Sequence, residues 1–101
     1  MAAIALHCKS QNYTYNAQAN EYTVGNWVIG KDRRRKLLGA KVILVKSIVQ
    51  SAYLGGTILR FEPTCNRKCK VIFREDASLV NNDESVKHKG WSNGRRSVCY
   101  I

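Results

Sequence analysis

Three aromatic residues occur beside glycines, where a small domain can present a ring at the mouth of a pocket. Trp27 follows a Gly-Asn pair, Tyr53 precedes a Leu-Gly-Gly segment, and Trp91 lies in a turn bounded by two glycines. Aromatic rings stack on bases of any sequence, and basic side chains around them can hold phosphates. The alternative is that both tryptophans belong to the core. The combination with clustered basic residues favours a nucleic-acid-binding site.

The positive charge is large and clustered. Seventeen Lys and Arg against seven Asp and Glu give a net charge of +10 and a pI near 9.8. Residues 31–46 hold seven basic side chains with Asp32 as the only acid, and residues 87–96 hold four with no acid. Such a field attracts polyanions, nucleic acid first and an anionic membrane surface or acidic protein second. A charge that serves solubility alone is the alternative.

The first basic cluster is expected on a short helix. Asp32 can cap it and Gly39 can end it, with Leu37 and Leu38 facing the core. The basic side chains then project outward, and the scarcity of acids among them favours a bound anion over a merely solvated face. We predict phosphate contacts from Arg33, Arg34, Arg35, Lys36, Arg95 and Arg96.

The elements that must position these residues are mainly strands. The bounded apolar run 42–45 is rich in β-branched residues and indicates a core strand. A second strand runs from Gly56 to Glu62, with the alternation Ile58, Arg60, Glu62 against Leu59 and Phe61, and Pro63 ends it. We also expect strands over 2–8, 21–29 (with a turn or bulge at its Gly-Asn pair), 70–74 and 97–101, and a turn or short helical stretch within 77–86.

Residues 10–20 are uncharged and polar, without a clear period, and predict a loop. The tyrosines Tyr13, Tyr15 and Tyr22 either cover the edge of the core or offer rings to a base.

The remaining reactive residues do not form a recognisable catalytic group. The only histidines are His7 and His88, and the sequence has no nucleophile elbow and no phosphate-cradling glycine loop, so we expect no enzyme and no cofactor. The four cysteines are expected to be reduced. Cys65 and Cys69 flank a basic turn that would favour reversible oxidation of an exposed pair, but their spacing is not that of a structural zinc site, and we predict no metal.

The length of 101 residues fits one domain, residues 1–101. The apolar runs are far shorter than a membrane span. The apolar start, residues 1–6, lacks the basic leader of a secretory signal, so we interpret it as a first strand of a cytoplasmic protein that does not bind membranes.

The order of these features resembles the PUA-like superfamily of small β-barrels, which includes EVE and ASCH domains. The resemblance covers residues 24–101; the tyrosine-rich loop and the Cys65–Cys69 turn are not features of that group. It implies an α+β fold, a mixed and mainly antiparallel β-barrel with one or two short helices. Members commonly bind RNA or a modified or flipped nucleotide. By this likeness, the cleft would be lined by Trp27, Lys46, Ser47, Tyr53, Gly55, Gly56 and Trp91.

A different class of function fits the charge as well. The chain could be a protein-interaction module, an accessory or inhibitory factor whose basic face covers an acidic surface. A homo-oligomer formed through the strand at 97–101 is compatible with both hypotheses. Co-purifying nucleic acid, visible as excess absorbance at 260 nm, distinguishes the two classes of partner. The sequence does not decide between RNA and DNA.

Overall fold

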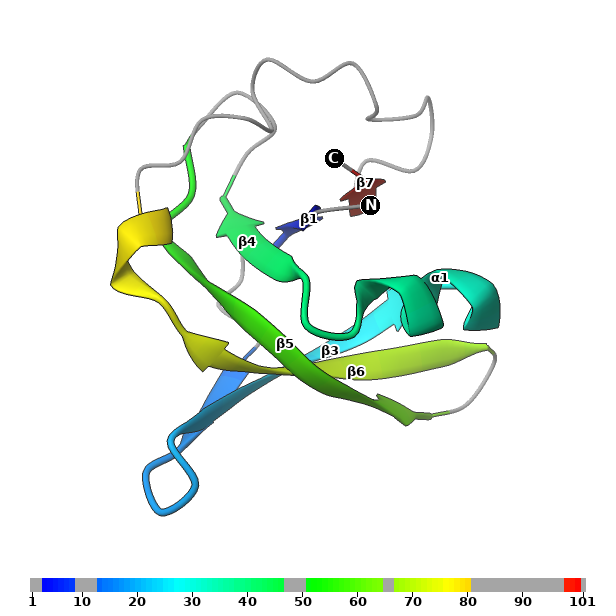
Figure 1. Ribbon diagram of the computed structural model, residues 1–101, viewed down its shortest axis with the longest axis horizontal. Helices are drawn as coiled ribbons and strands as arrows, with labels where there is room; N and C mark the ends of the chain where they lie inside the picture. Colours follow the sequence, from blue (N-terminus) through cyan, green and yellow to red (C-terminus); the bar gives the residue numbers. More distant parts are fainter. Residues whose placement is uncertain (1–2, 9–12, 47–50, 65–66, 81–97, 101) are drawn as a thin grey trace.

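The described part of the chain forms one mixed sheet with a single α-helix and a short 3₁₀ turn (Figure 1). The computed structural model describes residues 3–8, 13–46, 51–64, 67–80 and 98–100. The strand order is β2-β3-β6-β5-β4-β1-β7; β1 and β4 are parallel and the other neighbours antiparallel. The elements are β1 (Ala3–His7), β2 (Tyr13–Asn16), β3 (Glu21–Val28), α1 (Lys31–Leu37), β4 (Lys41–Val45), β5 (Leu54–Pro63), β6 (Lys68–Glu75), η1 (Ala77–Leu79) and β7 (Val98–Tyr100).

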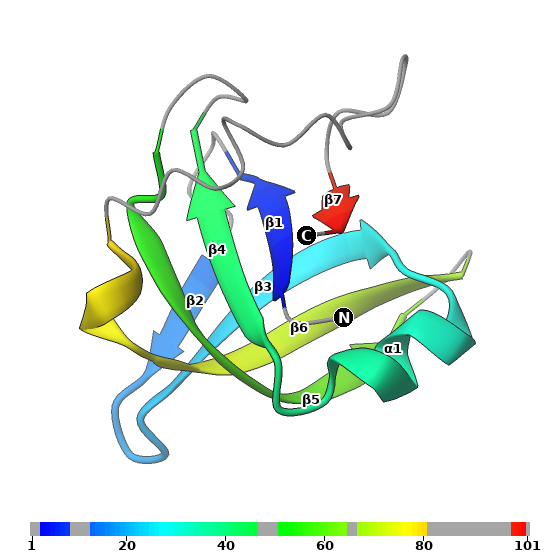
Figure 2. The same ribbon diagram turned by 45° about the horizontal axis from the view of Figure 1, so that its top comes forward.

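The sheet curls around the main core (Figure 2), so that β1 and β4 face β3 and β6 across it. The main core cluster draws side chains from strands on both sides of β5 in the strand order, with Ile4 and Leu6 from β1 and Val71 and Phe73 from β6. Leu37 of α1 closes the cluster and is fully buried. Burial of these apolar side chains is the main force that holds the curled sheet together.

The predicted core strand at 42–45 is confirmed as β4, and it is buried on both faces. Val42 and Leu44 enter the main core, whereas Ile43 and Val45 form a second cluster with Ala5 and Ala52. Leu79 of η1 packs against this second cluster. A strand covered on both faces needs a continuous apolar run rather than an alternating one.

The other strands predicted at 2–8, 21–29, 70–74 and 97–101 are also present, as β1, β3, β6 and β7. The β3–β6 pairing shifts register between Val24 and Trp27, which confirms the bulge expected at the Gly-Asn pair. Of the range 77–86, the structure describes residues 77–80, which contain η1.

The loop predicted for residues 10–20 is wrong at residues 13–16, whereas residues 17–20 form a turn and residues 10–12 lie outside the described residues. Residues 13–16 are strand β2, which forms a hairpin with β3 through a turn at 17–20. The pairing puts Tyr15 opposite Tyr22, with ring centroids 4.7 Å apart, so cross-strand packing forms a strand where the polar composition indicated none. Tyr13 and Tyr22 pack against the main core, whereas Tyr15 is 50% exposed.

The alternation predicted for the strand after Gly56 is interrupted. Ile58 pairs with Phe73 and Arg60 pairs with Ile72, so one step on β6 spans two residues on β5 and Leu59 is the extra residue of a bulge. The bulge moves every later side chain of β5 to the opposite face of the sheet. Phe61, which was expected on the face opposite Ile58, therefore shares its face and packs against the main core.

The basic helix is confirmed, but its ends differ in detail from the prediction. Gly30 is the N-cap and makes no side-chain cap bond, and Asp32 lies in the first turn. Gly39 ends the helix as expected, at a φ of +80° that favours glycine. Leu37 is buried, but Leu38 is 54% exposed, so the expectation that both leucines face the core is half wrong.

The mixed, mainly antiparallel sheet with one α-helix agrees with the expected fold class, but a closed barrel is not shown. In the described part of the chain, β2 and β7 end the strand order and do not pair with each other. The last strand pairs with β1 of the same chain, with Ala5 opposite Cys99. Within the same residues, no helix is long and apolar enough to cross a membrane.

Candidate functional site

Helix geometry divides the basic side chains of α1 into two sets. Residues three and four apart share one face of a helix, so Lys31, Arg34 and Arg35 project to the same side. Arg33 and Lys36, also three apart, lie on another face and are exposed. The helix therefore carries three cations on one face and two on another.

The C-terminal end of α1 is fixed against strand β5. The Gly39 amide donates to the Ile58 carbonyl at 3.0 Å, and the Ile58 amide donates to the Ala40 carbonyl at 2.9 Å. The buried side chain of Leu37 anchors the last turn in the core. These contacts set the face with the three cations beside β5.

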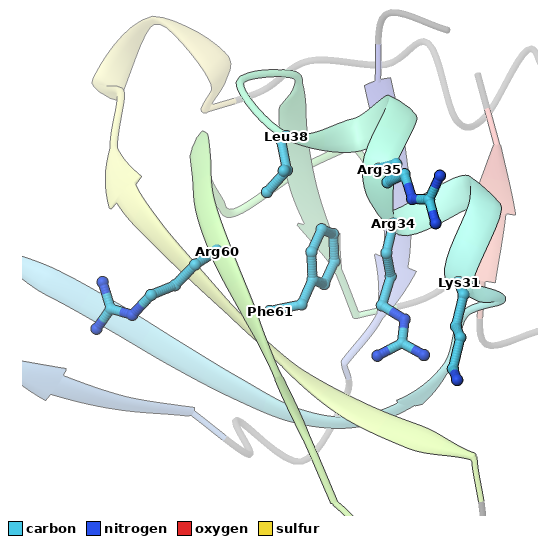
Figure 3. A pocket seen from close by; sticks show the side chains of 6 residues that line it. All are labelled: Lys31, Arg34, Arg35, Leu38, Arg60 and Phe61. Atoms are coloured by element: carbon cyan, nitrogen blue, oxygen red, sulfur yellow. The ribbon is translucent and has the colours of Figure 1, made fainter.

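An open pocket of about 440 Å³ lies between α1 and β5 (Figure 3). The ring of Phe61 lies between Leu38 and Arg34, with Lys31 alongside Arg34. The pocket has a cationic side formed by α1 and an apolar centre. Its volume is near the lower end of the range for small-molecule sites, about 300 to 1,000 Å³. The lining residues are Lys31, Arg34, Arg35, Leu38, Arg60 and Phe61.

The charge of Arg60 is already neutralised. Its guanidinium points away from Phe61 in Figure 3 and donates two hydrogen bonds to Glu21, of 2.8 and 3.0 Å to the two carboxylate oxygens. The hydrogen bond from Arg60 lowers the pKa of Glu21, so the acid stays ionised at neutral pH. Arg60 therefore contributes its aliphatic stem to the pocket rather than an uncompensated charge.

The three pocket cations of α1 lack such compensation. Lys31, Arg34 and Arg35 form no ion pair within the described residues, where the ion pairs are Lys41–Asp76 and Glu21–Arg60. The Nε atom of Arg34 is buried and has no hydrogen-bond partner there. A buried donor without an acceptor carries a desolvation cost.

Arg34 also lies close to the core beneath the pocket. Burial raises the pKa of the Cys69 thiol, and the positive charge of Arg34 partly opposes this shift. Cys69 pairs with Trp27 of β3, which is only 7% exposed and belongs to the main core. The indole Nε1 of Trp27, like Nε of Arg34, is buried without a partner among the described residues. The ring of Trp27 is therefore part of the main core and is not open to stacking.

Lys46 and Tyr53, two other predicted site residues, lie together but outside the pocket. The Lys46 ammonium is 5.6 Å from the centroid of the Tyr53 ring. The Tyr53 hydroxyl donates to the carbonyl of Cys8 at 2.8 Å, and burial together with this hydrogen bond raises the Tyr53 pKa. Tyr53 is thereby fixed to the chain at the end of β1.

The two predicted cleft glycines are packed against protein. A side chain at Gly55 would meet Leu79 and the backbone of Val42, and one at Gly56 would clash with the backbone of Arg74 and the ring of Phe73. Their lack of a side chain lets η1 and β6 approach β5 closely. Both glycines are buried.

The structure therefore brings Arg34 and Arg35 together in one site and places Trp27, Lys46, Tyr53, Gly55 and Gly56 elsewhere. The predicted residues Ser47, Trp91, Arg95 and Arg96, and Cys65 of the proposed redox turn, lie outside the described residues.

Sequence reasoning missed four lining residues of the pocket, Lys31, Leu38, Arg60 and Phe61. Lys31 was counted in the basic cluster but not assigned a contact. The i, i+3, i+4 spacing of Lys31 with Arg34 and Arg35 was the available signal. No signal in the sequence identified Phe61, because the face of the sheet on which Phe61 lies depends on the bulge at Leu59.

Within the described residues, no group of three or more His, Cys, Asp or Glu side chains could hold a metal ion. Cys8 and Cys69 are free and buried. Comparison of the chain with protein-family models, with curated proteins and with solved structures finds no match. The chemistry of the α1–β5 pocket therefore carries the argument about function.

Proposed function

We propose that the protein is a nucleic-acid-binding domain, not an enzyme, that uses the α1–β5 pocket as its main contact. The observation that carries the proposal is three uncompensated cations, Lys31, Arg34 and Arg35, beside the partly buried ring of Phe61. Cations that hold phosphates and a ring that stacks on a base are the two components of single-strand binding. A net charge of +10 adds long-range attraction for a polyanion.

The two components have different tasks. Arg34 and Arg35 bind phosphate oxygens, which supplies affinity with little discrimination among sequences. Phe61 offers a face to one unstacked base, and Leu38 supplies apolar contact beside it. Arg33 and Lys36, on the other face of α1, add contacts with neighbouring phosphates. A PUA-like barrel and a cytoplasmic location remain part of this proposal on the sequence grounds given above.

The proposal is tested by fluorescence anisotropy with labelled single-stranded and duplex RNA and DNA at increasing salt. The pocket variant is Arg34→Ala/Arg35→Ala. The matched control is Lys70→Ala/Arg74→Ala, which removes the same charge from exposed residues of β6 whose side chains alternate with the buried Cys69, Val71 and Phe73.

The wild type should bind at low salt, with affinity that falls log-linearly as salt rises. The pocket variant should lose about 1.4 units of salt slope on single strands, about 0.7 for each phosphate contact removed. The control should keep the slope. Equal loss of slope in both variants would remove the pocket from the model, and absence of binding to all four nucleic acids would overturn the proposal in favour of an acidic protein partner.

A further inference from the structure

We infer that the α1–β5 pocket receives the terminal phosphate of a nucleic-acid strand, a phosphomonoester, rather than a phosphodiester within the strand. This inference rests on the function proposed above and names the part of the ligand that the pocket selects. It follows from the grouping of charge on one face of α1, from the guanidinium of Arg34, which has no ion-pair partner among the described residues, and from the acidic residue that neutralises Arg60.

The first observation is the spacing of Lys31, Arg34 and Arg35, which lie three and four residues apart on one face of α1. Side chains three and four residues apart have Cβ atoms about 5–6 Å apart, close enough for their long side chains to reach the same group. At pH 7 a phosphomonoester carries a charge of about −1.5 to −2 and presents three terminal oxygens, whereas a phosphodiester carries one charge. Lys31, Arg34 and Arg35 therefore match a monoester better.

The second observation is the guanidinium of Arg34, which forms no ion pair with the described residues. Arginine presents its N–H donors in a fixed fork and recognises phosphate best by two parallel hydrogen bonds. With Lys31 and Arg35 on the same side, a third phosphate oxygen is needed for each cation to have a partner. A terminal phosphate supplies that oxygen.

The third observation is the asymmetry of the pocket. Glu21 neutralises Arg60 through two hydrogen bonds, and its ionised carboxylate stays on that side. A second phosphate on the Arg60 side would meet this negative charge rather than an uncompensated cation. The pocket therefore attracts phosphate on the α1 side alone, and the apolar surface of Phe61 and Leu38 is left for the terminal nucleoside.

The test uses oligonucleotides of one sequence, with an internal fluorophore, that carry a 5′-phosphate, a 3′-phosphate or hydroxyls at both ends. For the wild type, one phosphorylated end should bind about tenfold more tightly than the hydroxyl form, the factor expected for one additional charge-assisted hydrogen bond. Which end shows the preference identifies the polarity of the bound strand.

Three single variants of α1 make the comparison specific. Lys31→Ala removes an exposed pocket cation without touching the core, and it should reduce the preference to less than about threefold. The matched control, Lys36→Ala, removes an equal charge from the other face of the same helix; it should weaken all three oligonucleotides alike and preserve the ratio. Arg34→Ala should abolish the preference.

The outcomes separate this inference from the proposed function. Equal binding of the three oligonucleotides by the wild type overturns the inference and leaves nucleic-acid binding intact. Loss of the preference in Lys36→Ala to the same degree as in Lys31→Ala also overturns it, because the ratio would then reflect general charge. If the wild type binds none of the three, the proposed function fails and the inference fails with it.

Discussion

Replacement of Phe61 by leucine separates the stacking contribution of the pocket from its electrostatic contribution. Phe61 is partly buried and lies at the centre of the pocket, between Leu38 and the Arg34 side chain. Leucine keeps an apolar side chain against the main core but has no π face. Leucine is smaller than phenylalanine, but Phe61 is only partly buried, so the loss of stability should stay well below the roughly 3–5 kcal/mol of a buried Phe→Ala exchange and the variant should fold.

The expected loss of affinity follows from what the ring can contribute. Stacking of a base on an aromatic side chain is worth about 1–3 kcal/mol, so Phe61→Leu should weaken single-strand binding about fivefold or more. The charge of the pocket is unchanged, so the dependence of log K on log salt should keep its slope. Arg35→Ala should behave in the opposite way, with a slope reduced by about 0.7.

The assay is fluorescence anisotropy across a salt series, with thermal unfolding to show that each variant is folded. Tyr15→Leu is the matched control, because Tyr15 is a 50% exposed ring on the β2–β3 hairpin that is absent from the pocket lining. A folded Phe61→Leu variant that binds within about twofold of the wild type would refute stacking on Phe61. Loss of binding in Tyr15→Leu instead would place the stacked base on the hairpin.

Three further outcomes are expected, each with its own measurement. Gly56→Ala should lower the free energy of unfolding by about 1–3 kcal/mol or more in thermal or urea denaturation, because the new methyl would clash with the backbone of Arg74; unchanged stability would contradict the close packing of β5 on β6. The pKa of Asp76 is lowered from its ordinary value of 3.8, chiefly by hydrogen bonds from Ser78, so its carboxylate stabilises the fold above that pH and the benefit disappears as pH falls through the lowered value. Asp76→Asn should therefore be less stable than the wild type at neutral pH and equally stable in strong acid, and a constant difference across the pH range would contradict this. In native protein, Cys69 should react with an alkylating reagent at least about a hundredfold more slowly than in denaturant, as followed by mass spectrometry, because burial raises its pKa and access requires local opening.

The local signals in the sequence predicted the regular elements well, and tertiary pairing determined the rest. The apolar run 42–45 specified β4 because a strand covered on both faces needs unbroken hydrophobicity. The strand at 13–16 was missed because its stabilisation comes from pairing with β3 and from the contact between Tyr15 and Tyr22, which composition does not reveal. A window of sequence contains only one side of such a pair.

The candidate site, too, could be predicted only where its features are local in the sequence. The basic helix was predictable because charge spacing and a terminal glycine are local features. The same spacing divides the cations between two faces of the helix. Only the position of β5 shows which of these faces lies beside the ring of Phe61. Leu38 was expected in the core because an apolar residue beside Leu37 resembles a buried pair; in the structure it is exposed and lines the pocket.

The bulge at Leu59 connects the fold to the proposed function. Residues paired across two strands share a face of the sheet, and Ile58 pairs with Phe73 while Phe61 pairs with Val71, both on the core face. Regular pairing would place Ile58 and Phe61 on opposite faces, since they are three residues apart. The single extra residue therefore lets one strand bury an isoleucine in the core and also turn a phenylalanine toward the cations of α1. The proposed stacking surface beside the proposed phosphate site thus depends on an irregularity in strand pairing.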